Sequence, residues 1–222
     1  MNANQEKIDL QVCGNQLTEA VCSIFHTILL NRSVGKFSFN EDGTKSVGTV
    51  GYRDVDCNFV DLTYVACSSD VLDEHIRAPI REFSEQLRSC DATSSKPNGQ
   101  ISLQFYQKRK SRWKSTAAVP WEIWNLDVEL IKVNNQFEVE RNREEIGQVL
   151  SEKLFIVIEA LDKHIYIPDN VSSDNLDTIF ETSFPDIQPY LFEIMYVTPN
   201  SNTFFNNTKQ QIFNFLHKSV FL

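Results

Sequence analysis

Several patterns that would mark a particular class of protein are missing from this sequence. No run of apolar residues is long enough to span a bilayer, and residues 1–9 are polar where a secretory leader would have an apolar core. The nucleophile motif GxSxG, the zinc motif HExxH and a glycine-rich phosphate loop do not occur either. These absences predict a chain without a membrane span or a leader, and they give no support to an enzyme.

Disulfide and nucleic-acid signatures are also missing. The five cysteines are odd in number and no two form a CxxC pair. This usage is typical of a reduced compartment in which buried thiols pack as small hydrophobes, so we expect a cytoplasmic protein. The net charge of -9 argues against general nucleic-acid binding, because such binding needs positive charge to displace counterions from phosphates.

The most prominent feature that is present is a basic and aromatic segment. Residues 102–113 run from an apolar stretch into a basic patch that ends at Trp113, and a second aromatic cluster follows at residues 120–124. This pattern predicts two strands joined by a projecting loop, and such loops often make contacts. The basic patch alone could also be a solvated turn, a nuclear-import-like patch or a contact with anionic lipid. Trp113 favours a binding role, since an exposed indole is costly to leave in water.

Hydrophobic periodicity predicts one mixed domain. Helical spacing and a serine N-cap predict three helices, and alternation predicts strands between and after them. The expected helices cover residues 16–30, a segment from Ser69 to about Leu87, and residues 138–164. The expected strands lie at 8–14, within 36–67 with one from Phe59 to Val65, and at 101–107, 121–133 and 190–197. The first helix should be amphipathic, and the last strand, which is apolar on both faces, should be central or well covered. The fold class is therefore α+β, with three helices packed on a largely antiparallel sheet.

Two groups of residues could carry chemistry. Cys22 and His26 lie four residues apart, the spacing of two metal ligands on a helix, but their neighbours are core-like and no second ligand pair occurs. Cys57 lies between Asp56 and Asn58, and nearby carboxylates raise a thiol pKa, which is the wrong direction for a nucleophile. We therefore expect no catalytic residues, no metal and no cofactor. An enzyme that uses these residues remains a third and weaker class.

Seven stretches, in order, resemble one known family. They are residues 29–37, 47–51, 54–57, 61–65, 105–113, 120–124 and 186–191. Together they resemble the autophagy-related protein 101 family, HORMA-domain subunits of the autophagy-initiating kinase complex. Order and spacing agree from about residue 8 to 197, and no short motif alone carries the match.

The resemblance implies a fold and a function. It implies a HORMA-like domain over residues 1–199, with a C-terminal segment that wraps across the sheet, followed by a tail at 200–222. It further implies a non-catalytic adaptor that pairs with a second HORMA protein, autophagy-related protein 13, alongside the kinase and scaffold subunits. The expected location is the cytoplasm, and the phagophore assembly site when autophagy is induced. The alternative is a checkpoint-type HORMA adaptor, whose C-terminal segment closes over a linear peptide.

Candidate contact residues follow from the matching segments. We expect the heterodimer contact around Asn31 to Lys36, which includes Arg32 and Ser33, and around Asp54 to Asp56. Helix capping and turn chemistry could also account for such residues. Trp113 is the candidate anchor for later factors. In the family this tryptophan is followed by proline and phenylalanine, whereas Lys114 and Ser115 follow it here and the loop is one residue shorter.

The tail has a pattern of its own. Ile212, Phe215 and Leu216 recur at helical spacing within residues 208–222, which predicts an apolar helix face. Such a helix could dock on its own domain, bind a partner groove or lie on a membrane surface. Membrane binding is the least favoured, because two lysines attract anionic lipid only weakly.

Overall fold

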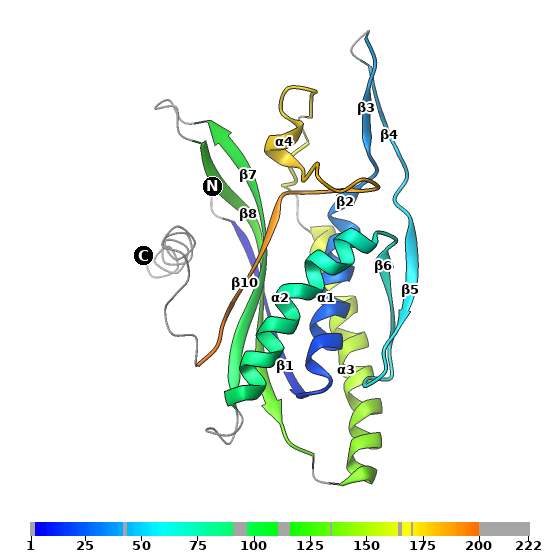
Figure 1. The fold of residues 1–222 in the computed structure, drawn as a ribbon, viewed down its shortest axis with the longest axis vertical. Helices are drawn as coiled ribbons and strands as arrows, with labels where there is room; N and C mark the ends of the chain where they lie inside the picture. The colour runs from blue at the N-terminus through cyan, green and yellow to red at the C-terminus, as the bar shows by residue number, and fades with distance from the viewer. Residues whose placement is uncertain are drawn as a thin grey trace.

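In the residues that the structure describes, the fold combines four helices with several sheets, and Figure 1 shows their arrangement. The structure is a computed structural model that describes residues 3–41, 44–90, 97–110, 116–133, 135–163, 166–169 and 171–199. Both Trp113 and the tail at 200–222, with its expected helix from 208, lie outside these residues. The mixed α+β class is confirmed, while the HORMA assignment and the domain boundary at 199 stay predictions.

The main sheet has four strands in the order β1-β8-β7-β10. These strands are β1 (Asn4–Cys13), β8 (Thr116–Ile131), β7 (Asn98–Lys110) and β10 (Phe192–Val197). The first strand runs parallel to β8, and the other two pairs are antiparallel, as expected for a largely antiparallel sheet. The inward positions are apolar and nearly inaccessible, for example Leu10, Leu103 and Leu126. One face of the sheet therefore forms half of the hydrophobic core.

Helix α1 (Leu17–Asn31) lies in the middle of the molecule, between the main sheet and a two-stranded ribbon (Figure 1). The ribbon consists of β5 (Tyr52–Asp56) and β6 (Thr63–Cys67), which pair antiparallel. Every residue from Ala20 to Leu29 is buried. The predicted helix is confirmed, but its predicted amphipathic character is wrong, because protein covers all of its sides.

Two long helices and one short helix follow α1. Helix α2 (Asp70–Ser89) begins as predicted after Ser69, whose hydroxyl accepts a hydrogen bond from the amide of Leu72 at 3.4 Å. The helix continues through Pro79. Helix α3 (Gln136–Lys163) packs beside α1, and the short helix α4 (Leu176–Ile179) follows it. In the part of the chain that the structure describes, no helix is long and apolar enough to cross a bilayer.

Small paired segments join these layers. The hairpin of β3 (Phe37–Phe39) and β4 (Lys45–Val47) projects beyond the body of the protein (Figure 1). Strand β2 (Ser33–Val34) pairs with β9 (Gln188–Pro189), after which the chain enters β10. Residues 188–197 therefore cross from the segment after α1 to the edge of the main sheet.

One strand prediction is confirmed and another is corrected. Within the described sheet β10 is an edge strand, and Phe192, Met195 and Tyr196 are well covered, which is the second of the two alternatives expected for it. The strand expected from Phe59 begins only at Thr63, because the preceding residues form a loop that meets α3.

Candidate partner-binding site

The β5–β6 ribbon places two of the predicted contact residues on an open surface. Its inner face buries Tyr64 and Ala66, and β6 packs on α1. Its outer face, which we call the ribbon face, is formed by alternate residues of both strands, as the two-residue period of a strand requires. The ribbon face consists of Tyr52, Asp54, Asp56, Thr63 and Val65, all of them exposed.

The ribbon face combines negative charge with apolar area. Tyr52 is 73% exposed, and Val65 lies opposite Asp54 in the pairing. The Thr63 hydroxyl donates to Asp56 Oδ1 at 2.6 Å, which fixes one carboxylate on the surface. No described residue forms an ion pair with Asp54. This surface can contact a partner without any rearrangement of the fold.

The other two predicted contact residues, Arg32 and Ser33, are held by contacts inside the fold. The Arg32 side chain is 4% exposed, and its Nε donates to Glu122 Oε2 at 2.8 Å. A second guanidinium nitrogen, Nη2, donates to the carbonyl of Leu161 in α3 at 3.2 Å. Ser33 is half-buried in β2, opposite Pro189. The structure thus explains both residues through the fold, and their part in partner binding stays a prediction.

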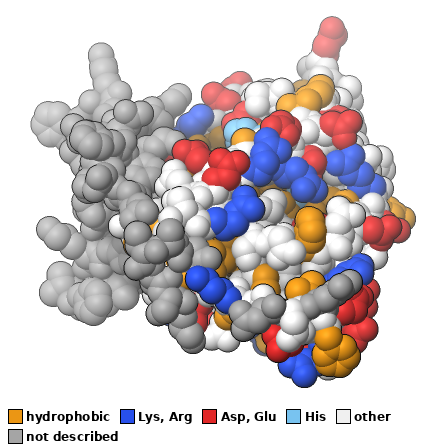
Figure 2. Space-filling model, turned by 60° about the horizontal axis from the view of Figure 1, so that its bottom comes forward, with side chains coloured by type: hydrophobic (Ala, Val, Ile, Leu, Met, Phe, Trp, Pro, Cys, Tyr) orange, Lys and Arg blue, Asp and Glu red, His pale blue; other side chains and the backbone are white. Residues whose placement is uncertain are grey.

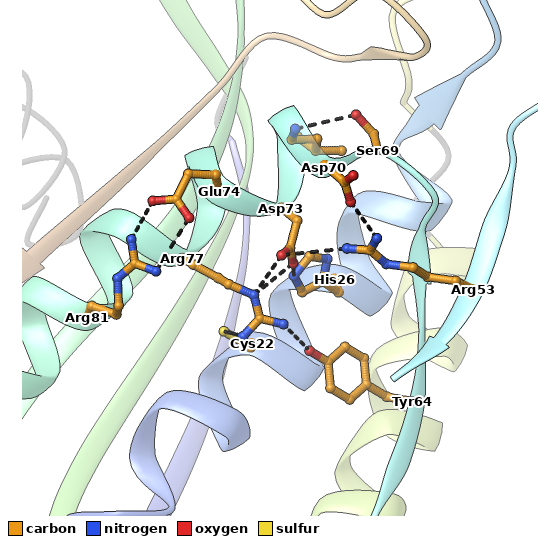
Figure 3. Close-up of polar contacts among 11 residues, drawn as sticks. Cys22, His26, Arg53, Tyr64, Ser69, Asp70, Asp73, Glu74, Arg77 and Arg81 are labelled. Atoms are coloured by element: carbon orange, nitrogen blue, oxygen red, sulfur yellow. Dashed lines mark hydrogen bonds and ion pairs between the residues drawn. The ribbon is translucent and has the colours of Figure 1, made fainter. Parts of the chain in front are cut away.

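A second polar cluster joins α1, α2 and the ribbon around one carboxylate (Figure 3). Asp73 Oδ1 lies 3.0 Å from His26 Nε2, and its Oδ2 accepts from Arg77 Nε at 2.8 Å. Arg53 on β5 approaches the same carboxylate at 3.6 Å and also pairs with Asp70 at 2.6 Å. The hydrogen bond from His26, helped by Arg77, holds the pKa of Asp73 well below its usual range, although burial opposes the shift.

The Asp73 cluster fixes the position of the ribbon. Arg77 donates from Nη2 to the hydroxyl of Tyr64 in β6 at 3.3 Å, so one guanidinium bridges α2 and the ribbon. Burial raises the pKa of Tyr64, which keeps that hydroxyl neutral. Asp73 and Arg77 were not predicted from the sequence as a pair. Their spacing of four residues on a helix was the available signal.

The residues considered for chemistry have other roles. Cys22 Sγ lies 3.9 Å from Arg77 Nη1, whereas His26 faces Asp73, so the two do not converge on a common point (Figure 3). Burial raises the pKa of the Cys22 thiol to about 12. Burial, helped by the charge of Glu19, likewise raises the pKa of Cys57 to about 12. Among the described residues, no three His, Cys, Asp or Glu side chains are grouped to hold a metal ion.

Charges of both signs are interspersed on the lower face of the molecule, and hydrophobic side chains form only small groups there (Figure 2). That view shows no continuous basic area of the kind that tracks a nucleic-acid backbone.

Comparisons with known proteins identify the family. The family model for autophagy-related protein 101 matches residues 9–174. Autophagy-related protein 101 of Xenopus tropicalis is 40% identical over 214 residues, which covers 96% of this chain and 97% of the relative. The human and rat proteins of the same name are each 41% identical over 197 residues, covering 88% of this chain and 89% of theirs. The chain belongs to the autophagy-related protein 101 family.

Proposed function

We propose that this protein is a non-catalytic adaptor in autophagy initiation that forms a heterodimer with a second HORMA protein, autophagy-related protein 13. The observation that carries the proposal is the family match, which extends over 96% of the chain rather than one motif. The raised thiol pKa values of Cys22 and Cys57 support a non-catalytic role, because a nucleophilic cysteine needs a thiolate. In the cell the protein acts in the cytoplasm, at the phagophore assembly site, together with the kinase and scaffold subunits.

A HORMA-like fold is part of the proposal. Three long helices lie on one face of a largely antiparallel sheet, and residues 188–197 cross from β2 to the sheet edge. That arrangement supports a domain whose C-terminal segment wraps across it.

The ribbon face is the proposed heterodimer contact. Asp54 and Asp56 supply charge that selects a partner surface with basic residues, and Tyr52 and Val65 supply apolar area. The Asp73 cluster keeps the ribbon in place against α1 and α2. Arg32 and Ser33 support the contact indirectly, by fixing the segment after α1.

A charge-reversal pair tests this surface. Asp54→Lys changes the ribbon face, and Asp162→Lys makes the same change on an exposed position of α3. Binding of purified autophagy-related protein 13 should weaken for Asp54→Lys only, while both variants keep the wild-type circular-dichroism melt. Equal binding by both variants would show that the ribbon face is not the heterodimer contact. Affinity purification from starved cells that recovers no autophagy-kinase subunit would overturn the adaptor function itself.

The peptide-clamping alternative rests on one observation, which is that β10 is held to the described sheet by β7 alone. A clamp would release or re-pair this strand when its peptide enters. Hydrogen exchange of residues 192–197 separates the two functions. Binding at the ribbon face leaves exchange of β10 unchanged, whereas clamping changes it.

Trp113 is the proposed anchor for later autophagy factors. Truncating an anchor tryptophan in an interface typically costs ~2–4 kcal/mol, or roughly 30- to 1000-fold in affinity. Trp113→Ala should therefore reduce recruitment while heterodimer formation and stability persist. A fall in melting temperature would instead place Trp113 in the core.

A further inference from the structure

The face of the main sheet that points away from the helices is buried in its middle. On β1 the outward residues Gln5, Lys7, Asp9 and Gln11 are all exposed, as expected for a sheet face in water. On the other three strands several outward residues are buried, although Asn98 and Val197, at one end of the sheet, are exposed. Four of the buried residues form what we call the outer patch: Ser102 at 2%, Gln104 at 6%, Ile123 at 3% and Met195 at 8% exposure.

Strand register makes the outer patch continuous. Gln104 lies opposite Ile123, and Ser102 lies opposite Met195, so the four side chains adjoin across three strands. The helices pack on the other face, where Phe83 of α2 contacts the ring of Tyr196. All the helices among the described residues lie on that side of the sheet (Figure 1). Because the helices lie on the opposite face, another part of the protein or a partner must shield these four side chains from water.

The C-terminal segment has the composition of such a cover. Residues 200–222 contain Lys209 and Lys218 and no acidic residue, in a chain whose net charge is -9. The hollow where β10 ends, with a volume of about 960 Å³, is lined in part by Asp9, Asp127, Glu129 and Pro199. Lys7 pairs with Asp127 at 2.8 Å and with Asp9 at 3.6 Å, so one positive charge offsets part of the charge of these three carboxylates. The four residues keep a net negative charge, which is complementary to the positive charge of the segment.

We propose that residues 208–222 lie on the outer patch of their own domain as an amphipathic helix, with Ile212, Phe215 and Leu216 against Ile123 and Met195. The described chain ends at residue 199, directly after β10, which carries Met195. A connector from Thr198 to Asn207 can reach up to ~35 Å when extended. Strand β10 is only ~20 Å long, and a helix of 15 residues measures ~22 Å. The connector and the helix therefore fit over the patch.

Oxidation of Met195 tests the proposal directly. The chain has two methionines, Met1 and Met195, so mass spectrometry of the peptide containing Met195 reports on this face alone. Phe215→Glu places a charge on the apolar side of the segment, and Asn214→Glu places the same charge on its other side. With hydrogen peroxide, Met195 should oxidise slowly in the wild type and in Asn214→Glu, and several-fold faster in Phe215→Glu. Equal rates in all three proteins would overturn the proposal.

Truncation after Asn207 provides a second variant, and it too should speed oxidation of Met195. If both altered proteins are insoluble, the wild-type rate is compared with that of free methionine, and equal rates exclude any cover. Protection of Met195 that develops only when autophagy-related protein 13 or anionic vesicles are added would assign this face to that partner and overturn self-docking.

Discussion

Arg32 and Glu122 form an ion pair in the interior of the protein, with 2.8 Å between Nε and Oε2 and side-chain exposures of 4% and 1%. The pair joins the end of α1 to the middle of β8. Trp124 Nε1 donates to the other carboxylate oxygen, and Leu161 of α3 accepts from the guanidinium. Three elements of the fold therefore meet at one carboxylate and one guanidinium.

Arg32→Leu should destabilise the protein by ~3–5 kcal/mol, because it leaves the carboxylate of Glu122 buried without its counter-charge. Urea unfolding followed by circular dichroism measures the change. Arg141→Leu is the matched control, since Arg141 pairs with Glu145 on the surface at 61% exposure for each side chain. If both variants unfold at the same urea concentration, the buried pair does not stabilise the fold and the structural role assigned to Arg32 is wrong.

Asp73 should make the free energy of unfolding decrease as the pH falls into the acidic range. Its pKa is lower in the folded chain than in the unfolded chain, so its contribution is complete above the unfolded pKa of about 4 and is lost as pH falls below that value. The urea midpoint of the wild type should therefore drop between about pH 5 and pH 3, and Asp73→Asn should flatten part of that drop. Glu145→Gln, an exposed carboxylate on α3, should leave the pH profile of the wild type unchanged. A profile for Asp73→Asn that parallels the wild type would contradict the assigned role.

Cys22, Cys57 and Cys67 should react slowly with alkylating reagents in the native protein. Burial raises the pKa of Cys57 to about 12 and that of Cys67 to about 11. At pH 8 a thiol of pKa about 12 is only about 10⁻⁴ ionised, and the thiolate is the reactive form. Iodoacetamide labelling with peptide mapping checks this, with urea-unfolded protein as the fast control. Rapid native labelling of Cys57 would revive a catalytic role.

Gly147→Ala should destabilise the protein, although alanine normally stabilises a helix by ~0.8–1 kcal/mol relative to glycine. A Cβ at position 147 would lie 2.2 Å from the carbonyl oxygen of Asp61, so the loop before β6 would have to move away from α3. Urea unfolding of this variant is compared with Gln148→Ala, on the exposed side of the same helix. An increase in stability for Gly147→Ala would show that this loop is free to shift.

The hydrophobic pattern of the sequence predicted the helices and strands well, but it did not predict how each one is buried or which strands pair. The α1 segment looked amphipathic because Ser23 and Thr27 interrupt its apolar residues. Both hydroxyls bond to backbone carbonyls of the same helix, at 2.9 and 2.8 Å, so they can be buried without another partner. Apolar residues on both faces of the last strand indicated cover, and the strand is covered, but strand order depends on pairings that local periodicity does not contain.

The candidate site was predicted to a similar degree. Alternation along β5 was enough to place Asp54 and Asp56 on one face. The partners of Arg32 could not be inferred, because Glu122 is distant in the sequence and becomes a neighbour only when β8 joins the sheet. Likewise, His26 and Asp73 meet only because α1 and α2 pack together.

The parallel pairing of β1 with β8 has a consequence for synthesis of the chain. Residues 4–13 find their partners only at residues 122–131, and the buried helix that follows β1 also needs the later ribbon and α3. The entropy cost of closing so long a loop must be met before the hydrogen bonds and packing of the sheet form, and this slows folding. The first apolar segments of a nascent chain therefore lack part of their native cover until more than half of the protein has left the ribosome, and apolar surface exposed in this way favours aggregation.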